Sequence, residues 1–155
     1  MTAPQTEFLY TTYIKSTPQK VWDAITTPEF ARQYWGNANV SDWKPGSKWE
    51  HVTSEGAVRV TGEILESVAP KRLVLSWVDP GKAADKSEYS RVAFEIEMAG
   101  DVVRLDVLHN QLKPGSEMAR GISNGWPRVL SGLKSFLETG MGLNIACASQ
   151  RARVA

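Results

Sequence analysis

The sequence predicts an α+β fold, in which a curved antiparallel sheet of about six strands carries two short helices and one long C-terminal helix. Two observations on the order of the segments support this prediction. Strand-like segments follow one another between residues 48 and 109 with only turns between them, so they lack the intervening helices of a parallel sheet. Two short helical segments precede this series, and one long amphipathic segment follows it. A single domain is expected over residues 1–140, since a chain of 155 residues suits one core.

The first elements are a strand and two short helices. Residues 8–14 (FLYTTYI) are aromatic and β-branched, which is typical of a strand. The Ser-Thr-Pro sequence at residues 16–18 supplies a cap and a first-turn proline for a helix over about residues 18–26. Pro28 interrupts the helical pattern, and a second short helix is expected over residues 29–34.

Five further strands are expected to form a meander. The turn sequence DWKPG at residues 42–46 introduces the first of them. We expect these strands over residues 48–53, 58–68, 73–78, 89–98 and 103–109. In the last two, apolar and polar residues alternate, so one face of each meets the core and the other meets water. His109 has the same parity as the apolar Leu105 and Val107, and its side chain is therefore expected to point inward.

A long amphipathic helix is expected between Ser116 and Gly140. Apolar residues recur there every three or four positions, and a glycine suits the C-terminal cap. Two glycines and Pro127 weaken its first half, so we expect a kink near Trp126. Residues 141–155 carry no strong pattern and are expected to form a weakly structured tail.

Composition excludes several classes of function. Eighteen Lys and Arg against seventeen Asp and Glu give a net charge of +1, too little to favour nucleic acid or an anionic membrane. One cysteine and two histidines provide neither an intrachain disulfide nor a Cys/His zinc cluster. No segment approaches the roughly 18–20 apolar residues of a membrane span, and no secretion signal or phosphate-binding glycine motif is present. We therefore expect a cytoplasmic monomer or homodimer without metal or cofactor.

Three segments carry a family resemblance. They are YWGNANVSDWKPGSKWEH at residues 34–51, VTGEILESVAPKRLVLSW at residues 60–77 and NGWPRVLSGLKSFLETG at residues 124–140. The chain resembles, over about residues 8–140, bacterial proteins related to the C-terminal domain of the activator of the heat-shock-protein-90 ATPase. That family lies in the START-like (SRPBCC) superfamily, which also holds polyketide cyclases and pollen allergens. The resemblance implies a helix-grip fold, in which the long helix and the sheet enclose a hydrophobic cavity.

The side chains expected to line that cavity are mostly aromatic or apolar and come from inward strand faces and helix stripes. They are Trp35, Trp49, His51, Trp77, Tyr89, Phe94, Ile96, Leu105, Val107, His109, Met118, Ile122 and Trp126. Each tryptophan buries roughly 150–250 Å² and offers one N–H donor, so several of them around a cavity suit a flat or apolar ligand. The same rings could instead fill a solid core.

Three functions follow as hypotheses. The first is the binding of a small hydrophobic molecule, either lipid-like or an aromatic metabolite. The resemblance implies two alternatives, a stress-response protein that acts on a chaperone or regulatory partner, and a polyketide cyclase-like or dehydratase-like enzyme. In such an enzyme His51, Tyr89 or His109 would act as acid or base. The sheet carboxylates alternate with apolar residues and are expected to pair across strands on the wet face, so no residue is assigned a catalytic role.

Overall fold

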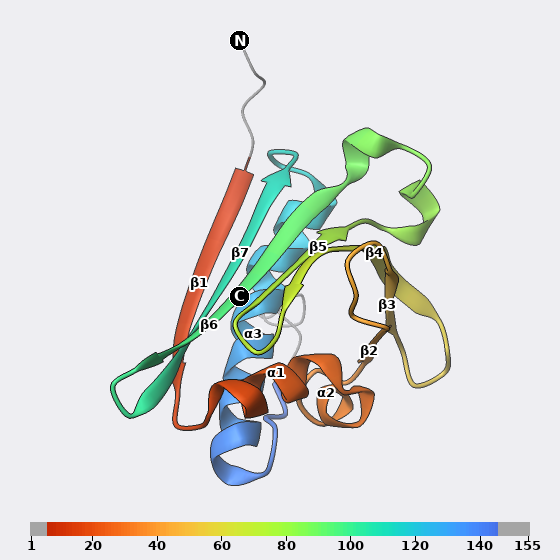
Figure 1. Ribbon diagram of the computed structural model, residues 1–155. Coiled ribbons are helices and arrows are strands. Elements are labelled where there is room, and N and C mark those ends of the chain that lie inside the picture. The colour runs from red at the N-terminus through yellow and green to blue at the C-terminus, as the bar shows by residue number, and fades with distance from the viewer. Residues whose placement is uncertain (1–5, 146–155) are drawn as a thin grey trace, which may run out of the picture.

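The computed structural model describes residues 6–145, in which a seven-stranded antiparallel sheet carries its helices on one face (Figure 1). The strands are β1 (Thr6–Ile14), β2 (Ala38–Ser41), β3 (Lys48–Val52), β4 (Val58–Val68), β5 (Arg72–Trp77), β6 (Ser90–Ala99) and β7 (Val102–Leu112). The helices are α1 (Pro18–Thr26), α2 (Pro28–Tyr34) and α3 (Glu117–Thr139), with two 3-10 turns, η1 (Pro80–Lys82) and η2 (Lys86–Glu88). The predicted fold class is confirmed, and the elements that were predicted occur in the expected order.

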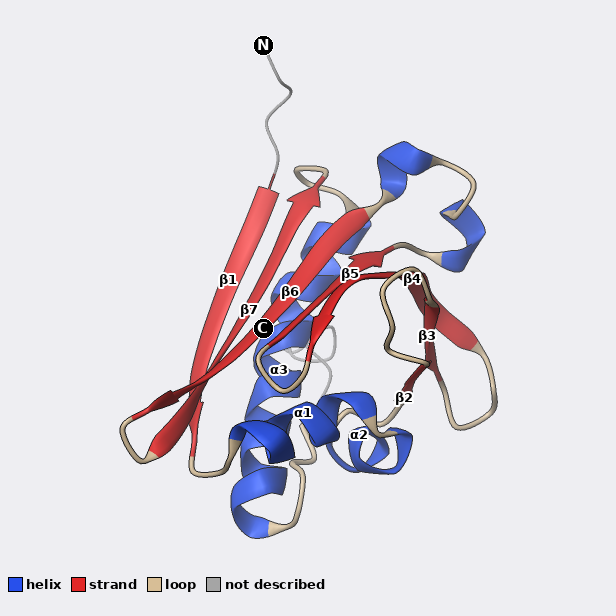
Figure 2. Cartoon of the chain, in the orientation of Figure 1, coloured by secondary structure: helices blue, strands red, loops and turns tan. Residues whose placement is uncertain are grey.

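The sheet order is β1-β7-β6-β5-β4-β3-β2, so the first strand of the chain pairs with the last. Helix α3 runs across one face of this sheet, and α1 and α2 lie across its lower end in the view (Figure 2). The two layers bury one continuous hydrophobic core between them. This arrangement encloses the inward side chains of β3, β5, β6 and β7 against α3.

Strand β2 was not predicted from the sequence. It is only four residues long, and its sequence, ANVS, has no strand-like alternation. Pairing with β3 defines it, with Asn39 opposite His51 and Ser41 opposite Trp49. The sheet therefore has one strand more than the six expected, and the extra strand forms one of its edges.

Both predicted ends of α3 are confirmed. The hydroxyl of Ser116 accepts a hydrogen bond from the Ala119 N–H at 3.1 Å, and Gly140 adopts the left-handed conformation at φ +86° that favours glycine at this position. Pro127 lies inside the helix and cannot donate the backbone hydrogen bond that another residue would make there. The bend expected near Trp126 stays a prediction.

The carboxylates of the outer sheet face are paired across strands only in part, since Glu63 and Glu97 have no ion pair among the described residues. Arg72 binds Glu66 at 2.9 Å and also Glu95 on the neighbouring strand. On β7, Arg104 lies 3.2 Å from Asp106. Such exposed pairs each contribute at most about 1 kcal/mol to the free energy of unfolding.

Residues 141–145 continue from α3 without regular secondary structure. The rest of the tail predicted to be weakly structured, residues 146–155 with Cys147, lies outside the described residues.

Candidate functional site

Four tryptophans and two histidines meet between the sheet and α3. They are Trp35 at the end of α2, Trp49 and His51 on β3, Trp77 on β5, His109 on β7 and Trp126 on α3. Neighbouring ring centroids in this aromatic cluster are 4.7 to 6.2 Å apart. At such separations the rings are in contact, so a molecule that enters between them must displace one of them.

Five more residues of the predicted set are buried in the same hydrophobic core as the cluster. They are Phe94, Ile96, Leu105, Val107 and Ile122. Phe94 meets the ring of Trp126 edge-on, with centroids 5.8 Å apart. Their burial follows from strand alternation on β6 and β7 and from the apolar stripe of α3.

Met118 and Tyr89 differ from the rest of the predicted set. Met118 is half-buried in the first turn of α3, where its sulfur accepts a hydrogen bond from Trp77 Nε1 at 3.2 Å. Tyr89 does not join the cluster. It precedes β6 with the opposite parity to the inward Ser90, and its hydroxyl donates to the Ala83 carbonyl at 2.8 Å on the other side of the sheet.

His109 is completely buried and has hydrogen bonds at both ring nitrogens. Nε1 of Trp126 lies 3.1 Å from its Nδ1, and the hydroxyl of Ser90 lies 2.7 Å from its Nε2. An indole N–H can only donate, so Nδ1 must be the acceptor and Nε2 must carry the proton. The proton on Nε2 then points to Ser90, whose hydroxyl donates to the Trp77 carbonyl at 3.3 Å.

His51 has the opposite tautomer. Its Nδ1 lies 2.8 Å from Oδ1 of Asn39, while the amide nitrogen of Asn39 donates to the Ile25 carbonyl at 2.9 Å. Oδ1 is therefore the acceptor, and Nδ1 of His51 carries the proton. The remaining nitrogen, Nε2, accepts from the Asn37 amide at 3.3 Å.

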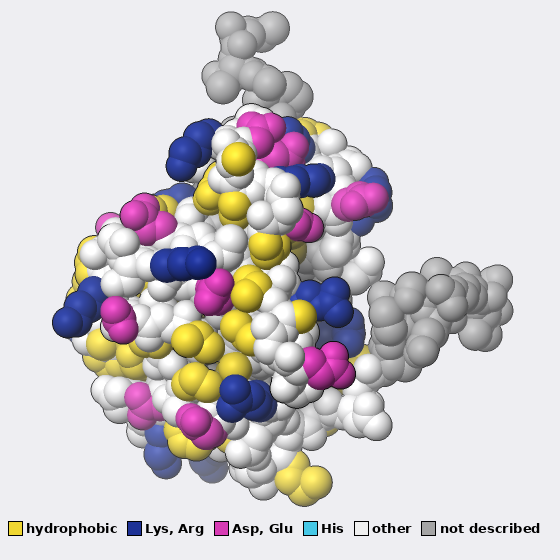
Figure 3. All heavy atoms as spheres, turned by 90° about the vertical axis from the view of Figure 1, so that its right-hand side faces the viewer, with side chains coloured by type: hydrophobic (Ala, Val, Ile, Leu, Met, Phe, Trp, Pro, Cys, Tyr) yellow, Lys and Arg dark blue, Asp and Glu magenta, His cyan; other side chains and the backbone are white. Residues whose placement is uncertain are grey.

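Burial keeps both histidines uncharged at neutral pH. It lowers the pKa of His51 to about 4 and that of His109 to about 3, because an apolar interior disfavours the charged imidazolium. Figure 3 shows the side of the molecule that carries β2 to β4, and among the described residues no histidine reaches this surface, although His51 lies on β3.

Sequence reasoning missed three polar partners in this site. Ser90 has the inward parity of β6 and could have been found from that alternation. Asn39 belongs to the unpredicted strand β2, and Asn37 to the turn before it, so only tertiary structure brings them to His51.

The Ser90–His109 pair does not form an activated nucleophile in this arrangement. A general base must accept the serine proton, but Nε2 of His109 already carries a proton and Nδ1 is occupied by Trp126. The site instead presents hydrogen-bonding groups inside an apolar, aromatic interior, which suits recognition of a ligand.

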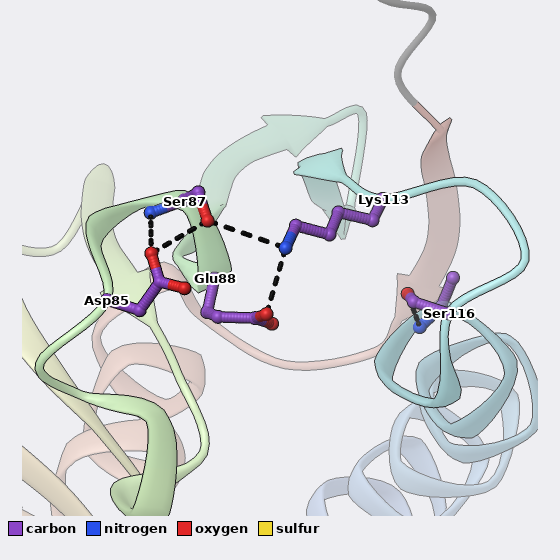
Figure 4. A network of polar contacts seen from close by, with 6 residues as sticks. Asp85, Ser87, Glu88, Lys113 and Ser116 are labelled. Carbon is purple, nitrogen blue, oxygen red and sulfur yellow. Dashed lines mark hydrogen bonds and ion pairs between the residues drawn. The ribbon is translucent and has the colours of Figure 1, made fainter.

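The connection between β7 and α3 is tied to η2 by exposed polar contacts (Figure 4). Nζ of Lys113 lies 2.8 Å from a carboxylate oxygen of Glu88 and 3.5 Å from the hydroxyl of Ser87. Asp85 accepts hydrogen bonds from Ser87, which lower its pKa. These contacts hold the two loops together beside the first turn of α3, where Met118 contacts Trp77.

Within residues 6–145, no three or more His, Cys, Asp or Glu side chains come together as a metal site would require. In the same part of the chain, no helix has the length and apolar character needed to cross a membrane.

Comparison with known proteins identifies a family and several similar structures. The model of the family described as "Activator of Hsp90 ATPase homolog 1-like protein" matches residues 15–138. No curated protein matches the sequence.

Three solved structures show the same fold. CalU16 from Micromonospora echinospora is 24% identical with a TM-score of 0.68, over 86% of this chain and 77% of its own. The Aha1 dimer from Colwellia psychrerythraea is 20% identical with a TM-score of 0.72, over 88% of this chain and 99% of its own. An HSP90 activator from Plasmodium falciparum is 22% identical with a TM-score of 0.70, over 84% of this chain and 95% of its own.

Proposed function

The chain belongs to the family of Activator of Hsp90 ATPase homolog 1-like proteins, and we propose that it binds a small, flat hydrophobic molecule between α3 and the inner face of the sheet. The buried hydrogen-bonded line from Trp126 through His109 to Ser90 carries this proposal. Polar groups are costly inside an apolar core, and a core built for stability alone does as well with apolar side chains. Ligand sites, in contrast, combine apolar walls with a few fixed polar groups that orient the bound molecule.

The four indole N–H groups of the cluster differ in their hydrogen bonds, and this difference supports the proposal. The N–H groups of Trp49 and Trp126 donate to Ser76 and His109, at 2.7 and 3.1 Å. Trp77 donates only to the thioether sulfur of Met118, which is a weak acceptor. A ligand oxygen in its place would accept a stronger hydrogen bond. Trp35 is half-buried, and its N–H has no acceptor among the described residues. Trp35 is therefore the ring of the cluster that moves at the lowest cost.

The first half of α3 also supports ligand uptake. Gly121 and Gly125 favour helix less than alanine by about 1 kcal/mol each, and Pro127 removes one backbone hydrogen bond. This half of the helix carries Ile122 and Trp126, which cover the inner face of the sheet. A wall with weakened local structure can separate from the sheet without unfolding the rest of the domain.

N-phenyl-1-naphthylamine, an uncharged flat probe that fluoresces in apolar surroundings, tests this function. We expect saturable binding at micromolar concentrations to the native protein, with backbone amide shifts on the inner faces of β5, β7 and α3. The variant Trp35→Ala should bind the probe with a faster association rate, because the ring that a ligand must displace is gone. Stopped-flow fluorescence measures this rate.

Trp43→Ala is the matched control, since Trp43 packs against the core from the turn before β3 and lies outside the aromatic cluster. Its association rate should stay at the wild-type value. A wild-type protein that shows no saturable change at high micromolar probe would mean that the tryptophans form a filled core, and the proposal would be wrong.

Family membership favours a second candidate function, the stimulation of a chaperone ATPase. The matched family takes its description from an activator of Hsp90, and one similar structure is described as an HSP90 activator. The test adds the purified chain to an Hsp90-class chaperone from the same cell and measures ATP hydrolysis. Stimulation that rises with the concentration of the chain is required for this function, and an unchanged rate contradicts it.

A further inference from the structure

Building on the proposed function, we infer that the ligand carries an anionic group, which Arg32 and Arg128 hold in a pocket beside the aromatic cluster. The chemical class is thus an amphiphile with a flat apolar body and a carboxylate, sulfonate or phosphate at one end. The pocket has a volume of about 440 Å³ and lies between the end of α2, the middle of α3 and residues 143–145. Trp35 and Asn37 also line it.

The charge of this pocket is positive and unbalanced. Arg32 and Arg128 both line it, and none of its lining residues is acidic. In the described part of the chain, neither Arg32 nor Arg128 has a carboxylate within 4.0 Å. Guanidinium groups bind carboxylate, sulfonate and phosphate oxygens through paired N–H donors, so two arginines that line one pocket favour an anion there.

The pocket adjoins the aromatic cluster through Trp35. This residue lines the pocket, and its ring also contacts Trp126 and His51 at centroid distances of 5.6 and 4.7 Å. Gly36 and Gly125 line the same pocket, and a Cβ added at either would meet nothing within 4 Å. A ligand that displaces Trp35 with its apolar body would therefore leave its other end in the pocket with the two arginines.

Residues 143–145 form one side of the pocket, and the residue before them, Gly142, lies close to α2. At Gly142 a Cβ would overlap the carbonyl oxygen of Gln33 and lie 3.0 Å from the Cα of Tyr34, so only glycine allows this approach. The hydroxyl of Ser135 further fixes the segment by donating to the Met141 carbonyl at 2.7 Å. Residues 143–145 are thus positioned as one side of the pocket, which the fold builds from segments about one hundred residues apart in the sequence.

Two probes that differ by a single anionic group test the inference. They are 8-anilinonaphthalene-1-sulfonate and N-phenyl-1-naphthylamine, which share the same aromatic body. We expect the sulfonate to bind the wild-type protein more tightly, and its affinity to fall with added salt. In the double variant Arg32→Gln/Arg128→Gln, its dissociation constant should rise about tenfold, as loss of charge-assisted hydrogen bonds predicts. The uncharged probe should bind this variant as it binds the wild type.

The double variant Lys44→Gln/Arg59→Gln is the control for net charge, because it also removes two positive charges. Lys44 and Arg59 are exposed, in the turn before β3 and on β4, and both lie outside the pocket. The affinity of this control for both probes should equal that of the wild type. If Arg32→Gln/Arg128→Gln keeps wild-type affinity for the sulfonate, or loses no more than Lys44→Gln/Arg59→Gln does, the anionic site is refuted, while binding of the uncharged probe still supports the proposed function. If the wild type binds neither probe saturably, the proposed function fails, and this inference fails with it.

Discussion

Replacing Gly62 by alanine is expected to lower the free energy of unfolding by about 3 kcal/mol or more, although it adds only one methyl group. Gly62 lies on β4, opposite Trp49 of β3. A Cβ at this position would overlap the backbone carbonyl oxygen of Ser76 and lie 2.7 Å from Nε1 of Trp49. Neither group can move alone, because the indole N–H of Trp49 donates a hydrogen bond to the carbonyl of Ser76 at 2.7 Å. The sheet therefore has to deform, or Trp49 has to leave the position from which it contacts Trp77.

Urea unfolding at pH 7, followed by tryptophan fluorescence, measures this loss. Gly121→Ala is the matched control, since Gly121 lies in α3 and an added Cβ would meet nothing within 4 Å. This control should be more stable than the wild type by up to about 1 kcal/mol, because alanine favours helix over glycine. A loss below about 1 kcal/mol in Gly62→Ala would contradict the close approach of β4, β5 and Trp49.

The sequence was sufficient to predict the fold and the burial of several residues of the candidate site, because both depend on periodicity. Alternation on β7 predicted that His109 points inward, and it is completely buried. Helical spacing predicted the buried Trp126, and the capping residues predicted both ends of α3. Such patterns are local, so they can be recognised before any tertiary contact is known.

Features that depend on tertiary contacts could not be predicted in this way. Strand β2 has no strand-like pattern and exists because β3 pairs with it, and it brings Asn39 to His51. The pocket with Arg32 and Arg128 depends on the packing of α2 against α3. Neither arginine lies in a motif that distinguishes it from other surface arginines. The same limit explains Tyr89, which was grouped with the inward residues although its parity places it on the other side of the sheet.

Lowering the pH from 7 to 4.5 is expected to lower the free energy of unfolding by about 5 kcal/mol, a large part of the total stability of a typical domain. His51 and His109 have folded pKa values of about 4 and about 3, below the value of 6.5 for an unfolded chain. The unfolded state therefore binds more protons. The resulting stability is present above about pH 6.5 and is lost as the pH falls toward the folded pKa values. Two pH units below 6.5, each histidine accounts for about 2–3 kcal/mol.

Carboxylates with lowered pKa values, such as Asp85 and Glu138, change the free energy of unfolding in a lower pH range than the histidines do. Their stabilisation is present above the pKa values of the unfolded chain and is lost only as the pH falls below about 4.5. Between pH 6.5 and 4.5 the loss therefore comes from the histidines. Urea unfolding at half-unit steps across this range measures it.

The variant His109→Gln separates the contribution of one histidine. A glutamine can accept from Trp126 and donate to Ser90, but it does not titrate. The loss of stability between pH 7 and pH 4.5 should therefore fall to about half of the wild-type loss, whatever the stability of the variant at pH 7. An undiminished loss would mean that His109 is already charged in the folded protein. In a charged His109, Nδ1 would carry a proton and face the N–H of Trp126. Two donors cannot form a hydrogen bond, so the bond from Trp126 to His109 would be lost.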